Sequence, residues 1–352
     1  MSFTGLISEQ PSENYKRFSK VKNFLVGDTL VFANLESPVN ESDEFNEYKA
    51  LFYYSEKKVT IELLKRLNIK ALSLANNHIY DLKMPGLKAT IKLLEDLGIN
   101  YTGAGWKKEH VKPAIVSIKG FKVGFIAYVD KSTNPRTEFF PELFINYLEP
   151  EKVMDDIKSI RDKVDKIICS VHWGMDYSRF FTKMQQMLAR KLIDAGADII
   201  MGHHPHTFQP YEVYKDGVIF YSLGQLCNGD MFWEGEMRAL KRKTKISYIP
   251  VLNEDFTIER FIKTKELKGN YIKIYQRNRY EAYNRRLYKL NILKNNNKLV
   301  DVFINIKENV IDRFIEYFFG YYRNPFKQVL SIFRNIHKIK YIKRDLNKTY
   351  KS

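Results

Sequence analysis

Short apolar runs, each followed by polar residues, recur along the first two thirds of the chain. Four of them have the length of a buried strand. They lie at 30–33, 71–75, 166–171 and 198–202. Between these runs, apolar residues at helical spacing, such as Val59 and Leu63, predict helices. The predicted helices lie at 56–67, 85–97, about 150–163 and about 180–195.

Paired apolar runs around short turns predict two hairpins. Residues 114–118 and 122–127 flank one turn, and residues 211–214 and 218–221 flank a Lys-Asp-Gly turn. Residues 1–4 fit a first strand. Because helices alternate with buried strands, the sequence predicts an α/β fold with layered mixed β-sheets flanked by helices.

Carboxylate, amide and imidazole side chains follow all four buried runs. In open α/β sheets, ligands bind outside the carboxyl ends of the strands, so these side chains are expected to converge. Five of the seven histidines lie in these loops, a set typical of a metal-dependent hydrolase. For the loop that holds His203, His204 and His206, the alternative is a solvated loop that happens to be rich in histidine. The residues are Glu36, Asn77, His78, Asp81, His172, His203, His204 and His206.

Six motifs, in order, make the chain resemble a known family. It is the bacterial capsule synthesis CapA family (PgsA-like, poly-γ-glutamate biosynthesis), whose fold is similar to that of calcineurin-type metallophosphoesterases. The motifs span roughly residues 1–230. They are Ala33-Asn34-Leu35-Glu36, Leu74-Ala75-Asn76-Asn77-His78, Tyr101-Thr102-Gly103-Ala104-Gly105, Val171-His172-Trp173-Gly174, Gly202-His203-His204-Pro205-His206 and Tyr221-Ser222-Leu223-Gly224.

The resemblance implies a set of metal ligands. Glu36 would bridge two ions. Asn77, His172 and His204 would hold one of them, and His206 would belong to the other. Paired cations polarise a phosphoryl or carbonyl oxygen and activate water near neutral pH. The mixed nitrogen and oxygen ligands favour manganese, zinc or iron over calcium.

The resemblance also implies an acid–base pair. His78 would protonate the leaving group, and Asp81 would orient its ring. An ordinary loop histidine hydrogen-bonded to Asp81 is the alternative for this pair.

Two positions depart from the family pattern. After the first strand the family usually has Gly-Asp, in which the Asp binds metal; here Leu6 occupies this lost ligand position. Glu9 is one possible replacement. Gln225 stands where the family usually has Asn, a change that bears on the loop more than on the metals, whereas Leu6 removes a ligand. We therefore expect one retained ion rather than two, and weakened or altered hydrolysis.

Composition limits the setting in which the protein acts. Two cysteines cannot build a disulfide framework, and no signal peptide or spanning apolar stretch is evident. We expect a cytoplasmic protein, with peripheral attachment to the inner face of the membrane as a further option.

Positive charge is concentrated in the last third of the chain. Residues 256–352 hold 23 Lys and Arg but 8 Asp and Glu, a net charge of +15 out of +17. We predict a domain at 1–250 and a basic, partly helical extension at 251–352. The extension fits an anionic polymer or an acidic membrane surface, and nucleic acid is less favoured. An amphipathic helix near 324–338 would either dock on the domain or lie on anionic lipid.

Two functions fit these features. The first is a metal-dependent, phosphoesterase-like hydrolase in the biosynthesis of an anionic capsule polymer. The second is a non-catalytic assembly or binding factor with a degenerate metal site, working beside the capsule synthesis machinery. The retained histidines favour the enzyme, and Leu6 favours the assembly factor.

Overall fold

A computed structural model gives the structure of the chain. The residues that it describes are 2–3, 29–49, 52–226, 231–233, 236–238, 242–266, 272–275 and 280–308. Leu6, Glu9 and the expected helix at 324–338 lie outside these residues.

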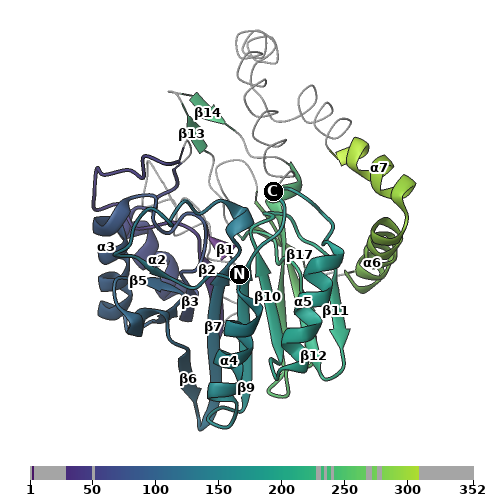
Figure 1. Cartoon of the computed structure of the whole chain (residues 1–352), viewed down its shortest axis with the longest axis horizontal. Helices are drawn as coiled ribbons and strands as arrows, with labels where there is room; N and C mark the ends of the chain where they lie inside the picture. The colour runs from purple at the N-terminus through teal and green to yellow at the C-terminus, as the bar shows by residue number, and fades with distance from the viewer. Residues whose placement is uncertain are drawn as a thin grey trace.

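The first layer is a four-stranded parallel sheet, in the order β1-β2-β3-β4. Two helices pack on it through buried apolar side chains at helical spacing, among them Leu63 and Leu64 of the first helix. Figure 1 shows both helices on the outer side of the molecule. The elements are β1 (Ser2–Phe3), β2 (Val31–Leu35), α2 (Lys57–Arg66), β3 (Ile69–Ser73), α3 (Lys83–Asp96) and β4 (Asn100–Thr102).

The second layer is a six-stranded mixed sheet, in the order β11-β12-β10-β9-β7-β6. Its four middle strands run parallel, and the two outer strands, β11 and β6, pair antiparallel with their neighbours. Helices α4 and α5 cover one face of it. The elements are β6 (Ala114–Ile118), β7 (Phe121–Val129), α4 (Pro150–Arg161), β9 (Lys166–His172), α5 (Lys183–Asp194), β10 (Ile199–His203), β11 (Tyr211–Tyr214) and β12 (Gly217–Phe220).

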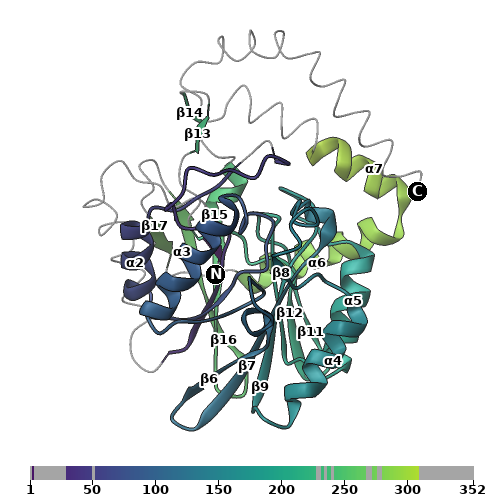
Figure 2. The ribbon, with the colours of Figure 1, turned by 60° about the vertical axis from the view of Figure 1, so that its left-hand side comes forward.

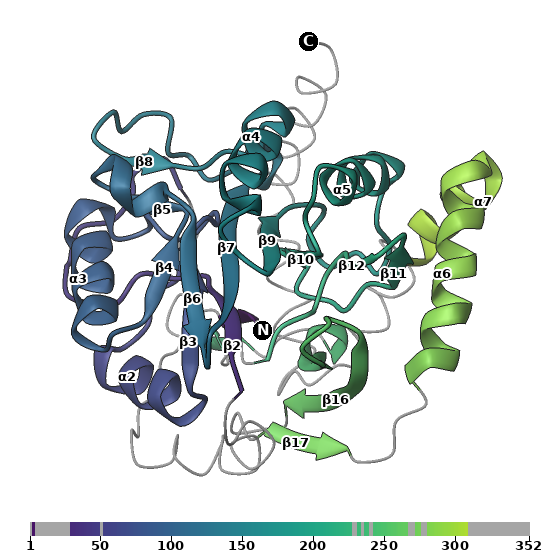
Figure 3. The same cartoon turned by 90° about the horizontal axis from the view of Figure 1, so that it is seen from below.

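A third, antiparallel sheet packs against the two larger sheets. It consists of β15 (Ile246–Leu252), β16 (Ile258–Glu266) and β17 (Ile272–Tyr275). Figure 3 shows its strands β16 and β17 in the lower part of the view, on the side of the larger sheets opposite α4. Ala71 of β3, Phe125 of β7 and Phe261 of β16 belong to one buried cluster, so all three sheets share a core. The predicted fold of layered mixed sheets flanked by helices is therefore confirmed.

The remaining elements lie at the edges. β5 (Ala104–Gly105) pairs with β8 (Phe144–Ile145), and β13 (Met231–Trp233) pairs with β14 (Glu236–Arg238). Helix α6 (Tyr280–Asn296) packs beside β11, and α7 (Lys298–Ile306) packs against α6. None of the described helices has the length and apolar character that spanning a bilayer requires.

The proposed division near residue 250 stays a prediction. Residue 250 lies inside β15, and Ile249, Ile262 and Ile272 are buried in the same cluster as Leu72 of β3. The strands on both sides of residue 250 therefore pack as part of one core, and the charge boundary does not coincide with a gap in the packing.

Gly202 allows β10 to approach the chain that follows β12. A Cβ atom at this position would lie 2.0 Å from the carbonyl oxygen of Tyr221. We expect Gly202→Ala to lower the free energy of unfolding by about 3 kcal/mol, because the added methyl group forces the backbone of Gly202 or of Tyr221 to move. Urea unfolding measures the change. Gly120→Ala is the control: it meets no atom within 4 Å and bears only the strain of a φ of +87°, about 1 kcal/mol. Equal losses in the two variants would contradict the steric argument.

Candidate metal centre

The ends of four parallel strands bring the predicted residues together. Glu36 follows β2 directly, Asn77 and His78 lie in the loop after β3, His172 ends β9, and His204 follows β10. In the second sheet, His203 of β10 is in register with His172 of β9. Every predicted site residue that the structure describes is buried.

Glu36, His172 and His204 form the tightest group. Each offers one ligand atom, and the three atoms lie within 4.8 Å of one another. The Nε2 atom of His172 is 3.5 Å from the Glu36 carboxylate and 2.8 Å from the amide oxygen of Asn77. Buried polar atoms normally have partners, yet the Nδ1 atoms of His172 and His204 have none among the described residues. One carboxylate and two imidazoles are ligands that fit a divalent cation.

Both imidazoles of this group favour the neutral form. Burial lowers the pKa of His204 to about 4, against the opposing pull of Asp176. Burial also lowers the pKa of His172 well below its ordinary value, and the neighbouring His204 adds to the effect. A neutral imidazole has a lone pair to give, so both rings are in the ligating form at pH 7.

His206 lies slightly farther out. Its Nε2 atom is 3.8 Å from Glu36 and 3.7 Å from the Asp176 carboxylate. Its Nδ1 atom is 2.8 Å from the side-chain oxygen of Gln225, so this departure from the family pattern contacts a predicted ligand directly. Asp176 also lies 3.5 Å from His204. It brings to the centre a carboxylate that the sequence interpretation did not include.

His78 and Asp81 form the expected pair. The Nδ1 atom of His78 is 2.6 Å from Asp81, and the Tyr53 backbone N–H donates to the same carboxylate at 2.7 Å. The ring of Tyr53 packs edge-on against His78. The pKa of His78 is lowered to about 4, chiefly by burial; Asp81 opposes this shift, and the Lys49 charge contributes to it.

Lys49 is the second residue that the sequence interpretation missed. Its ammonium group lies 2.5 Å from Asp81, 3.0 Å from the Nδ1 atom of His78 and 2.5 Å from the carbonyl oxygen of Asn77. Only 7% of its side chain is exposed. Lys49 lies in a polar loop without strand or helix periodicity, so its sequence carried no signal. Asp176, four residues beyond His172, could have been found as a carboxylate in a strand-end loop.

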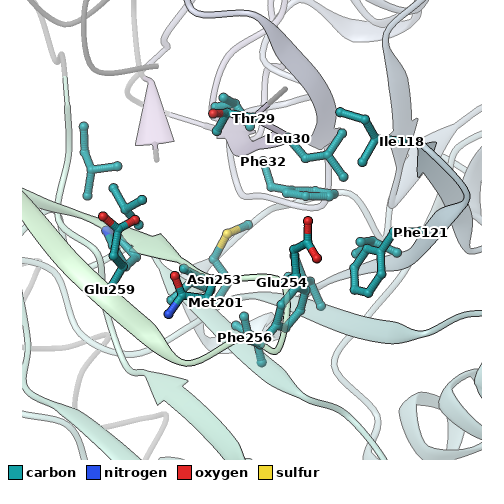
Figure 4. A pocket seen from close by; sticks show the side chains of 18 of the residues that line it. Thr29, Leu30, Phe32, Ile118, Phe121, Met201, Asn253, Glu254, Phe256 and Glu259 are labelled. Carbon is teal, nitrogen blue, oxygen red and sulfur yellow. The ribbon is translucent and has the colours of Figure 1, made fainter. Parts of the chain in front are cut away.

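A separate cavity of about 960 Å³ opens at the other end of the sheets. Thr29 precedes β2 and Ile199 begins β10, so the cavity lies at the amino ends of these strands. Figure 4 shows Phe32, Phe121 and Phe256 around it. None of the predicted site residues lines it.

The fold and the site define a class of protein. They are those of a layered α/β protein with carboxylate, amide and imidazole side chains gathered at the ends of parallel strands. Residues 6–230 match the family described as bacterial capsule synthesis protein PGA_cap. The chain belongs to this family, which confirms the resemblance seen in its motifs.

Curated relatives agree with this assignment. The chain is 33% identical over 214 residues to the capsule biosynthesis protein CapA of Bacillus anthracis. The aligned region covers 59% of this chain and 52% of that protein. The chain is 30% identical over 209 residues to the PGA biosynthesis protein CapA of Bacillus subtilis (strain 168), covering 59% and 55%. The chain thus spans about half the length of the curated relatives it matches.

Solved structures give weaker likenesses. The 5'-nucleotidase precursor from Thermus thermophilus matches with a TM-score of 0.40 and 17% identity, over 74% of this chain and 48% of that one. The calcineurin-like phosphoesterase YfkN from Bacillus subtilis matches with a TM-score of 0.36 and 14% identity, over 76% and 72%. At these scores neither likeness adds to the assignment, which rests on the family match.

Proposed function

We propose that this chain is a metal-dependent, phosphoesterase-like hydrolase that acts in the biosynthesis of an anionic capsule polymer, either poly-γ-glutamate or capsular polysaccharide. The buried group of Glu36, His172 and His204 beside the pair of His78 and Asp81 carries this proposal. Membership of the capsule synthesis family supports the place in polymer biosynthesis. The polymer and the capsule synthesis machinery are the proposed partners.

We propose that the described residues of the centre hold one divalent ion. Glu36, His172 and His204 would hold a manganese, zinc or iron ion, and the amide of Asn77 lies beside His172. When bound, the ion supplies a Lewis acid that polarises the scissile bond. His206 and Asp176 would contact the outer side of the centre, where they can orient substrate or a second, weaker ion.

His78 is placed to move the proton. Asp81 and Lys49 both contact its Nδ1 atom, so Nε2 is the nitrogen left to exchange a proton with substrate. When the Nδ1–H donates to Asp81, Nε2 is unprotonated and acts as a base. When Lys49 donates to Nδ1, Nε2 carries the proton and can pass it to the leaving group. Lys49 is therefore a positioning residue that selects the role of His78.

We expect Lys49→Met to slow hydrolysis by about 10- to 100-fold without changing metal content. Because the Lys49 charge lowers the pKa of His78, its removal raises that pKa. The limb of the kcat pH profile that reports the titration of His78 should therefore move to higher pH. Lys58→Met, on the exposed side of α2, is the control. Steady-state kinetics across pH, with metal analysis of each variant, measures the effect. An unshifted profile with normal turnover would leave Lys49 without this role.

The alternative function is a non-catalytic assembly or binding factor. The observation in its favour is Leu6, which replaces a carboxylate ligand of the family. The deciding experiment is metal content per chain after purification without chelator, together with hydrolysis of a generic phosphoester after manganese is added. Bound metal with turnover supports the enzyme. Absence of turnover with every metal tried would reject it for these substrates and favour the assembly role.

A further inference from the structure

Helix α7 presents an apolar stripe to solvent. Four large apolar side chains, spaced three, four and seven residues from the first, lie on one side of the helix. Their exposed fractions are 81% for Leu299, 48% for Val302, 66% for Phe303 and 49% for Ile306. On another side of the helix, Ile304 already packs against Leu287 and Phe180. The stripe is therefore not what attaches α7 to the fold.

Helix α6, which packs against α7, also exposes cations and apolar side chains. Arg285, Arg286 and Lys289 are exposed, and so are Leu290 and Leu293 on the same helix. Lys294 pairs with Asp301 at 2.6 Å, which joins α6 to α7 and neutralises an acidic group of α7. Figure 3 shows the two helices together at one margin of the molecule, away from α2 and α3, and Figure 2 shows α7 on the side opposite α2.

We infer that α6 and α7 form a surface that binds an anionic lipid bilayer. The stripe of α7 would enter the boundary between headgroups and acyl chains, and the cations of α6 would contact lipid phosphates. Both helices lie beyond the residues matched to the family, in the part of the chain that carries most of the positive charge. This inference is independent of the metal centre.

Three features favour lipid over other occupants. A soluble polyanion would use the cations but has no use for an aliphatic stripe. A single-stranded nucleic acid stacks on aromatic rings, whereas three of the four stripe residues are Leu, Val and Ile. A second copy of this chain could cover the stripe, but symmetric pairing would bring like charges of α6 close together.

Vesicle binding of the full chain tests the inference. We expect wild type to co-sediment with vesicles that contain phosphatidylglycerol and much less with pure phosphatidylcholine. The double variant Leu299→Asp and Phe303→Asp should bind the anionic vesicles at least about 10-fold more weakly. The neutral pair Leu299→Gln and Phe303→Gln should weaken binding as well, which separates apolar contact from charge. Because these side chains are exposed, the melting temperature should hardly change.

The matched control is Met184→Asp with Met187→Asp on α5. These methionines are 73% and 49% exposed, so the control adds the same two charges to another helix at similarly exposed apolar positions. It should bind vesicles within about twofold of wild type. Equal loss in the control and α7 variants would overturn the inference, because the effect would then come from net charge.

Two other outcomes would also overturn it. If the α7 variants convert a dimer to a monomer in analytical ultracentrifugation and still bind vesicles normally, the stripe is an interface between copies. If the variants bind vesicles like wild type, and an oligonucleotide releases the wild-type chain from them, the cations serve a soluble polyanion.

Discussion

The variant His204→Ala is expected to lose its bound ion. The wild-type chain, purified without chelator and supplied with manganese, should retain close to one ion per chain. His204 belongs to the tightest ligand group and has a buried ring nitrogen without a partner among the described residues. Removing one of three such ligands leaves Glu36 and His172, too few to hold an ion through gel filtration. We expect affinity to fall by roughly 100-fold or more.

Metal analysis by mass spectrometry, with calorimetric titration of manganese, measures this loss. The control is His110→Ala. His110 packs against Trp106 outside the centre, so its removal takes away an imidazole without touching a predicted ligand. The control should keep its ion. If His204→Ala also keeps its ion, or if the wild type binds none, Glu36, His172 and His204 are not a metal site.

His78→Asn is expected to abolish most hydrolysis and to leave the ion in place. His78 is outside the closest ligand group, but its ring is fixed by Asp81 and Lys49. Loss of a general acid or base costs about 100- to 10,000-fold in turnover. We expect kcat to fall in this range while metal content stays that of wild type. Steady-state hydrolysis of a phosphoester, with metal analysis of the same preparation, measures both.

Asp81→Asn provides the matched comparison. It retains the shape of the side chain but removes the carboxylate that contacts both Lys49 and the His78 ring. If Asp81 acts only through His78, the double variant should be no slower than His78→Asn alone. Normal turnover in His78→Asn would instead make His78 an ordinary loop residue bonded to Asp81. Loss of metal in that variant would move His78 into the ligand set.

The local elements could be predicted from the sequence because their signals are local. The apolar run at 166–171 lies in β9, and the helix expected at 85–97 corresponds to α3 at Lys83–Asp96. Burial imposes a period on each segment, and that period can be detected without knowledge of its neighbours. The rule that ligands gather at strand ends also predicted that Glu36 and His204 would lie close together.

The predicted domain boundary rests on charge alone and stays a prediction. The charge of the last third suggested a division near residue 250, yet Ile249 and Ile262 pack in one core cluster with residues of the first sheet. Charge patterning reports what faces solvent or a partner. It says little about the inward side of the same strands, which decides what packs together.

The sequence by itself determined the order of helices and strands, the family motifs and the set of polar residues at the strand ends. Only the tertiary structure decided that Lys49 contacts His78 and Asp81, that Asp176 reaches His204, and that Gln225 contacts His206. It also decided that the outer stripe of α7 is exposed. The physical reason is that periodicity shows which side of an element is apolar, whereas a contact between loops or a bare helix face depends on how separate elements pack.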